Sequence, residues 1–202
     1  MLKAVIFDVG GVLIRTHSWV GREKWATKLG MDARDFEDFV FGGESGRQAQ
    51  LGQITSAEHW GRLADHFGLD GSGITELRRD FFSGDLLDET LVAYIKRLRR
   101  AGYRTGLLSN AGNEARQLLS GDYPIIDEFD GVVISAEVGV MKPAPEIYRL
   151  AAESVDADVK EALFVDDVME NVEGARAVGM QALHFTDPDL VRQQLSEITA
   201  VV

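Results

Sequence analysis

The sequence contains no cysteine among its 202 residues. This absence excludes disulfide frameworks, thiolate zinc sites and a cysteine nucleophile, and it makes a reducing, cytoplasmic location the expected one. Positive charge is also scarce, because 21 Lys and Arg residues face 33 Asp and Glu residues and the formal net charge is −12. A negative field of this size disfavours nucleic acid and anionic membranes as partners, but a small anion can still bind at a local site.

Long apolar runs are absent as well. The first run, at 4–7, is interrupted by Asp8 and is too short for a signal peptide or a membrane span. Hydrophobic residues make up 45% of the chain and charged residues 27%, which is typical of globular proteins. The chain is long enough for one domain with a buried core, or for a core with a smaller insert.

Short apolar runs, rich in β-branched or aromatic residues, each end in a polar residue. Such runs predict buried parallel strands, here at 4–7, 105–108, 132–134, 162–165 and 181–185. Helical patterns alternate with the later strands, at 86–101, 113–120, 145–154, 168–178 and 188–198. This alternation predicts an α/β fold, a Rossmann-like parallel sheet with helices on both faces.

The stretch 16–83 interrupts the alternation, because it has no convincing strand but several helical patterns. The best of them places Trp60, Leu63, Ala64 and Phe67 at helical spacing. An insert this long after the first strand far exceeds a usual βα loop and would stand over the carboxyl ends of the strands. We therefore expect a helical cap domain at 16–83 on a core formed by 1–15 and 84–202.

Polar residues at the strand ends meet in one crevice of such a sheet. Asp8, Ser109, Asp166 and Asp167 all stand at carboxyl ends of predicted strands. Three converging carboxylates repel one another unless a cation lies among them, and Mg²⁺ suits a site with only oxygen ligands. The alternative is that each aspartate simply caps the helix that follows it.

Two further segments could bind phosphate. Ser109 and Asn110 begin a strand-to-helix turn with a hydroxyl and exposed backbone N–H groups, although both are also common turn residues. Lys142 precedes Pro143 in a stiff segment, so its ammonium can be held beside the crevice, where it would balance aspartates and a phosphoryl group. A loop lysine can equally be only a solvated charge.

Together these segments resemble the four motifs of the haloacid dehalogenase-like hydrolase superfamily. The motifs are FDVGGVL at 7–13, LLSN at 107–110, MKP at 141–143 and FVDD at 164–167, with Asn171 four residues on. The four motifs occur in the family's order, with the helical insert between the first motif and the second. The match spans nearly the whole chain. The segment QLGQITSAE at 50–58 resembles a cap segment of the branch that includes epoxide hydrolase N-terminal phosphatases and sugar-phosphate phosphatases.

The resemblance implies a role for each matching residue. Asp8 would be the nucleophile and form an aspartyl-phosphate that water hydrolyses. Mg²⁺ would bind Asp8, the backbone carbonyl of Gly10, Asp167, and Asp166 directly or through water.

On the substrate side, the same resemblance implies that Ser109 and Lys142 hold the phosphoryl oxygens. Asn110 would line the pocket, and Asn171 would support the loop on the metal side.

One departure from the family pattern concerns the general acid. Most phosphatases of this family carry a second aspartate two residues after the nucleophile, where this sequence has Gly10. A general acid or base contributes about 10²–10⁴ in rate, so we expect a substrate with a good leaving group, such as a sugar 1-phosphate or an acyl phosphate. His17, just past the first strand, is a candidate substitute in substrate binding and proton transfer, but it can equally be a hinge or surface histidine.

The sequence thus favours a cytoplasmic Mg²⁺-dependent phosphatase acting on a small phosphorylated metabolite. One alternative is a metal-independent 2-haloacid dehalogenase, which the Asp166-Asp167 pair and the absence of an aromatic two residues after Asp8 disfavour. The other is a nearly inert binding or regulatory protein on the same fold, which the glycine at position 10 makes conceivable.

Overall fold

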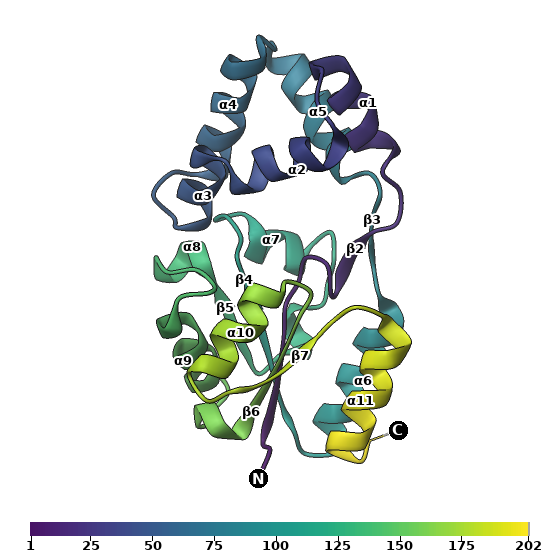
Figure 1. The fold of residues 1–202 in the computed structure, drawn as a ribbon, viewed down its shortest axis with the longest axis vertical. Coiled ribbons are helices and arrows are strands. Elements are labelled where there is room, and N and C mark those ends of the chain that lie inside the picture. The colour runs from purple at the N-terminus through teal and green to yellow at the C-terminus, as the bar shows by residue number, and fades with distance from the viewer. Residues whose placement is uncertain (202) are drawn as a thin grey trace.

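A computed structural model describes residues 1–201, and its core is a parallel sheet of five strands in the order β5-β4-β1-β6-β7 (Figure 1). The predicted Rossmann-like fold is confirmed, and each predicted run matches an observed strand to within one residue at either end. The strands are β1 (Ala4–Phe7), β4 (Arg104–Ser109), β5 (Gly131–Ile134), β6 (Ala162–Asp166) and β7 (Gln181–His184).

Helices cover both faces of this sheet. Successive side chains of a strand point to opposite faces, so apolar side chains of each buried strand need a covering helix on both sides. In β1, Val5 and Phe7 belong to one buried apolar cluster, whereas Ala4 and Ile6 belong to the other. The first cluster includes residues of α6 (Glu89–Arg100) and α11 (Pro188–Thr199). The second includes residues of α9 (Pro145–Ser154) and α10 (Met169–Ala177).

The start of the helix predicted at 86–101 was wrong. Residues Asp85–Leu87 form strand β3, which pairs antiparallel with β2 (Ile14–Thr16), and α6 begins only at Glu89. Asp88 caps this helix by accepting the N–H of Leu91 at 2.9 Å. The strand partner of β3 lies about 70 residues earlier in the chain. The helical periodicity of a segment does not indicate such a distant strand pairing.

Between β2 and β3 the chain forms a helical insert, defined here as residues 20–82. Its helices pack around their own buried cluster, which includes Trp25, Phe36, Trp60 and Phe81. Within residues 1–201 no helix is long and apolar enough to cross a bilayer. The insert helices are α1 (Val20–Leu29), α2 (Ala33–Gly42), α3 (Glu44–Gln50), α4 (Ser56–Phe67) and α5 (Gly71–Phe82).

We expect Trp25→Ala to destabilise the insert strongly. Trp25 is fully buried in the apolar cluster, and its indole N–H donates to Asp80 at 3.1 Å. Truncating a buried tryptophan removes apolar contacts and leaves a cavity, which costs about 3–5 kcal/mol. Urea unfolding followed by circular dichroism measures the loss, with half-buried Trp19→Ala as the control. A loss no larger than that of the control would contradict the assignment of Trp25 to the insert core.

Candidate active site

The central strands bring the predicted site residues together at their carboxyl ends, on the side of the sheet that faces the helical insert (Figure 1). Asp8 directly follows β1, and its N–H donates to the Val165 carbonyl of β6 at 2.9 Å. Ser109 ends β4 and Asp166 ends β6, the two strands on either side of β1. The strand order therefore brings these polar residues together at one edge of the sheet, as the sequence predicts.

A buried lysine links two of these carboxylates. The Nζ of Lys142 lies 2.8 Å from Asp8 Oδ1 and 2.7 Å from Asp166 Oδ2, and all three side chains are buried. Burial lowers the pKa of the Lys142 ammonium, but the carboxylates of Asp8 and Asp166 outweigh this effect and raise the pKa above its ordinary value. The side chain of Lys142 is therefore a fixed positive charge at the centre of the site.

Asn110 holds the backbone of this lysine in place. Its Nδ2 donates to the Lys142 carbonyl at 3.0 Å, and its Oδ1 accepts the Lys142 N–H at 2.8 Å. Both polar ends of the amide are thus bonded to the segment that carries the ammonium. The substrate-binding role of Asn110 stays a prediction, whereas its bonds to Lys142 give it a positioning role that the sequence did not reveal.

The two carboxylate oxygens of Asp8 differ in their surroundings. Oδ1 accepts the Val9 N–H at 2.7 Å as well as the Lys142 ammonium, and Oδ2 takes part in neither bond. Burial raises the pKa of Asp8 to about 8 against the opposing effect of Lys142. A divalent cation at the same carboxylates would lower this pKa. Asp8 Oδ2 is the oxygen that remains for a reaction.

The carboxylates of Asp8, Asp166 and Asp167 each place an oxygen within 4.8 Å of the other two. Asp166 is heavily bonded, because its Oδ1 accepts the Val168 N–H at 2.8 Å and the Asn171 amide at 3.0 Å, while its Oδ2 accepts Lys142. Burial, with the Asp166 charge as a smaller contribution, raises the pKa of Asp167. Asp8 and Asp167 are thus the members with carboxylate oxygens best placed for a cation, and Asn171 orients Asp166.

The adjacent glycines at positions 10 and 11 face different surroundings. A Cβ on Gly11 would overlap the Asp167 carboxylate, and the φ of Gly11 is +76°, in the left-handed region. A Cβ on Gly10 would have no heavy atom within 4 Å. Gly11 is therefore required for Asp167 to approach the β1 loop as closely as it does, whereas a Cβ at position 10 meets no neighbouring atom.

For the phosphatase activity that the motif resemblance implies, we expect Gly11→Ala to lower phosphate release by about tenfold to a hundredfold, because the new methyl group displaces Asp167 and small displacements in a site cost this much. Phosphate release from acetyl phosphate at saturating Mg²⁺ measures the effect. Gly10→Ala, at the open neighbouring position, is the matched control. Equal activity of the two variants would contradict the steric role given to Gly11.

The remaining predicted residues lie at different depths. Ser109 is buried at the end of β4, beside the cluster. His17 is exposed in the segment between β2 and α1, and its backbone N–H donates to the Gly84 carbonyl at 2.8 Å. Its role in proton transfer or substrate binding stays a prediction.

Two contacts that support the site residues could not be predicted from the sequence. The Nε2 of His184, at the end of β7, lies 2.9 Å from the Asp167 carbonyl. The hydroxyl of Tyr148, in α9, donates to the Asn171 carbonyl at 2.8 Å. His184 and Tyr148 lie 17 and 23 residues from the residues they contact, and spacing along the chain does not reveal such pairs.

The helical insert touches the core beside the loop that follows Asn110. The N–H of Ser56, at the start of α4, donates to Asn113 Oδ1 at 2.8 Å, and Arg78 of α5 pairs with Glu114. Gly52 packs so closely on the Ala136 carbonyl of α8 (Ser135–Val138) that a Cβ would not fit. The insert therefore rests on the loop that begins α7 (Ala115–Ser120), next to the candidate site.

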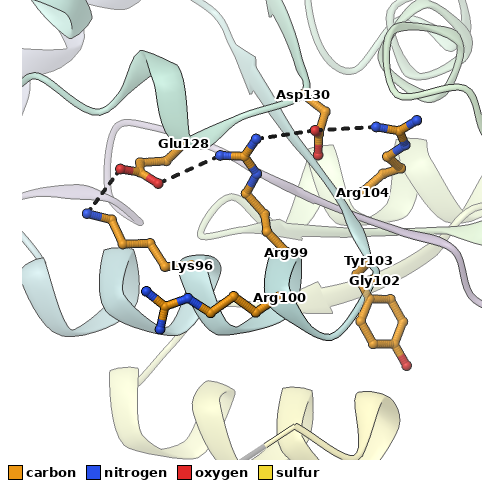
Figure 2. A pocket seen from close by; sticks show the side chains of 8 residues that line it. All are labelled: Lys96, Arg99, Arg100, Gly102, Tyr103, Arg104, Glu128 and Asp130. Atoms are coloured by element: carbon orange, nitrogen blue, oxygen red, sulfur yellow. Dashed lines mark hydrogen bonds and ion pairs between the residues drawn. The ribbon is translucent and has the colours of Figure 1, made fainter.

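A separate pocket of about 660 Å³ lies at the opposite edge of the sheet, around the end of α6 and the start of β4 (Figure 2). Its cations are largely paired, because Lys96 lies 3.0 Å from Glu128, and Asp130 lies 3.5 Å from both Arg99 and Arg104. Basic residues at a helix C-terminus also offset the helix dipole. This pocket is apart from the carboxylate cluster, and we assign it no function.

The family follows from a match to a family model that covers the chain from β1 to the end of α10. Residues 2–179 match the family model for haloacid dehalogenase-like hydrolases. The chain belongs to the haloacid dehalogenase-like hydrolase family. As a member of this family it is a hydrolase, and the resemblance seen in the four motifs is confirmed.

Named relatives of this haloacid dehalogenase-like hydrolase include phosphatases and a dehalogenase. The chain is 32% identical over 186 residues to sesquiterpene phosphatase astK of Aspergillus oryzae, with 92% of this chain and 90% of that protein covered. It is 27% identical to (S)-2-haloacid dehalogenase 1 of Pseudomonas sp., with 91% and 84% covered. Sequence similarity alone therefore does not distinguish phosphate hydrolysis from dehalogenation.

The fold of the haloacid dehalogenase-like hydrolase is also similar to solved structures. A HAD family enzyme from Bacteroides thetaiotaomicron, bt-2542, in complex with magnesium and inorganic phosphate, superposes with a TM-score of 0.76 at 22% identity. The alignment covers 95% of this chain and 99% of that one. At this identity the likeness establishes the fold alone.

Proposed function

We propose that this hydrolase is a Mg²⁺-dependent phosphatase that cleaves a small phosphomonoester through an aspartyl-phosphate on Asp8. The observation that carries the proposal is the difference between the two carboxylate oxygens of Asp8, of which one is held in place and the other is left for a reaction. Lys142 holds Asp8 Oδ1 at 2.8 Å, while Oδ2 takes part in neither of the bonds that Oδ1 makes. A carboxylate oxygen of Asp8 also lies within 4.8 Å of one of Asp167. A nucleophile needs both a fixed position and a free electron pair.

In the first step, Asp8 Oδ2 attacks the phosphorus atom and a new O–P bond forms while the bond to the departing alkoxide breaks. The alkoxide then takes a proton from water or from a nearby acid. In the second step, water attacks the same phosphorus, loses a proton and releases inorganic phosphate, which restores the Asp8 carboxylate. Lys142 and Ser109 would hold the phosphoryl oxygens and stabilise their charge in both steps.

The residues present fit a magnesium ion. Three carboxylates within 4.8 Å form a set of hard oxygen donors, and the chain has no cysteine to offer a softer ligand. Asp8, Asp167 and the Gly10 carbonyl would hold the ion, with Asp166 nearby. When bound, Mg²⁺ would supply charge neutralisation between the carboxylates and the incoming phosphate.

Position 10 limits the choice of substrate. Gly10 offers no side chain to protonate the departing oxygen, so we propose that the substrate has a leaving group that departs without strong acid help, as a sugar 1-phosphate or an acyl phosphate does. His17 stays the candidate substitute from the segment before α1. Residues 16–83, which include the helical insert, would act as a cap over a core of 1–15 and 84–202. A cytoplasmic location agrees with the absence of cysteine.

A panel of candidate substrates tests the proposal. We expect phosphate release in the presence of Mg²⁺, loss of at least tenfold in EDTA, and recovery on adding Mg²⁺ back, because the carboxylate cluster needs its cation. The panel contains a sugar 1-phosphate, a sugar 6-phosphate, acetyl phosphate and, for the dehalogenase alternative, 2-chloropropionate. Halide release that is unaffected by EDTA, with no phosphate release, would overturn the phosphatase proposal.

A further inference from the structure

Two neighbouring strands of the sheet stop pairing at the point where the candidate site begins. Ser109, the last residue of β4, lies opposite Ile134, the last residue of β5, in their parallel ladder. Beyond this pair, residues 110–114 form a loop before α7, and α8 follows β5 directly. The regular ladder therefore no longer fixes the loop that carries Asn110, and other contacts have to hold it.

Ser135, the first residue of α8, supplies two such contacts through one hydroxyl group. Its Oγ accepts the N–H of Ala111 at 3.0 Å and donates to the Ala111 carbonyl at 3.3 Å. Ser135 is 0% exposed, so water does not compete for either bond. A hydroxyl can both donate and accept, and here it fixes both backbone groups of the residue that follows Asn110.

The two residues before Ala111 belong to the candidate site. Ser109 is buried at the strand end, and Asn110 bonds to the Lys142 N–H at 2.8 Å and to the Lys142 carbonyl at 3.0 Å. The ammonium of Lys142 in turn lies 2.8 Å from Asp8. A shift of Ala111 would therefore move Asn110 and change the position of the ammonium.

The helical insert contacts the same loop at its other end. The N–H of Ser56 donates to Asn113 at 2.8 Å, and a Cβ on Gly112 would lie 2.6 Å from Ser56 Oγ. These contacts hold residues 112–113, whereas the bonds from Ser135 hold the residue between them and Asn110. Ser135 is therefore the anchor that lies nearest to the site along the loop.

Resting on the proposed phosphatase function, we propose that Ser135 is a positioning residue for phosphoryl binding. Its hydroxyl fixes Ala111 and thereby the direction of Asn110, and Asn110 holds the segment from which the Lys142 ammonium reaches Asp8. Ser135 does not bind the phosphoryl group itself, because its hydroxyl is already bonded to Ala111. Its substitution should thus weaken phosphate binding without removing any group that touches phosphate.

Ser135→Ala tests this role. We expect kcat/KM for acetyl phosphate to fall at least about tenfold, mainly through a higher KM, because small displacements in a site cost this much. The inhibition constant of inorganic phosphate should rise as well. In this variant the Ala111 carbonyl keeps the Ala136 N–H as a donor at 3.3 Å, but the Ala111 N–H loses its acceptor.

These readouts separate positioning from a general loss of stability. A smaller folded fraction lowers the apparent kcat but leaves KM and the inhibition constant unchanged. Ser154→Ala is the matched control, because it removes a hydroxyl that donates to the Ala151 carbonyl within α9, and it should keep both constants. Ser135→Cys, which keeps the side-chain size with a weaker donor, should give intermediate values, and it carries the comparison if the alanine variant does not fold.

A double variant tests whether Ser135 acts through Asn110. Asn110→Ala removes both bonds to the Lys142 backbone and should raise KM by itself. If Ser135 acts through Asn110, adding Ser135→Ala to this variant should change KM little further, because coupled residues are not additive. Two effects that multiply in full would contradict this route and overturn the proposal.

The outcomes also separate the positioning role from the phosphatase function. Folded Ser135→Ala with the KM and the inhibition constant of the unsubstituted protein would overturn the positioning role and leave the phosphatase function standing. No phosphate release from acetyl phosphate by the folded, unsubstituted protein with Mg²⁺ would overturn the proposed function and this inference together.

Discussion

Asp8→Asn is expected to lower phosphate release by about 10⁴-fold or more, because an amide oxygen cannot attack phosphorus as a carboxylate does. The substitution keeps the size of the side chain at a buried position, and it keeps an oxygen that can accept the Lys142 ammonium now bound at 2.8 Å. The fold should therefore survive. Steady-state phosphate release with Mg²⁺, together with circular dichroism, measures both properties.

Asp122→Asn is the matched control for this variant, because it makes the same chemical change on an exposed side chain outside the carboxylate cluster. We expect it to retain the activity of the unsubstituted protein. If Asp8→Asn, properly folded, kept more than about a tenth of the activity, Asp8 would not be the nucleophile and a water-activating mechanism would replace the one proposed.

Gly10→Asp is expected to raise the hydrolysis of esters with poor leaving groups, such as a sugar 6-phosphate, by about 10²–10⁴-fold, the usual contribution of a general acid. A Cβ at this position would have no heavy atom within 4 Å, so the backbone there accepts the first atom of a side chain without a clash. The neighbouring carboxylates of Asp8 and Asp167 would raise the pKa of the new acid, which favours the protonated form that a general acid needs.

The comparison that tests this gain is between Gly10→Asp and Gly10→Asn, which have nearly the same shape but differ in their ability to give up a proton. We expect the gain only in Gly10→Asp, and only for poor leaving groups, because an acyl phosphate departs without protonation. Identical rates for both variants on a sugar 6-phosphate would show that the missing acid does not limit this enzyme.

Much of the core could be predicted from the sequence because its strands are buried on both faces. Each strand then appears as an apolar run, and the polar residue after it, as at Asp8 and Ser109, marks the edge where the site forms. The short strand at Asp85–Leu87 could not be predicted in this way, because its partner lies about 70 residues away and its own burial is only partial.

The supporting contacts of the site depend on three-dimensional neighbours in the same way. The bonds from Asn110 to the Lys142 backbone join segments 32 residues apart, and the approach of His184 to Asp167 joins segments 17 apart. Spacing along the chain does not encode such pairs.

The most direct test of the central claim is to find the phosphoryl group on the protein. Unsubstituted protein is mixed with acetyl phosphate and Mg²⁺, quenched in acid within milliseconds, and digested for peptide mass spectrometry. The account predicts a phosphorylated peptide that contains Asp8, present during turnover and absent in Asp8→Asn. Phosphate release that proceeds with no phosphorylated Asp8 at any quench time, or with the phosphoryl group on another residue, would contradict it.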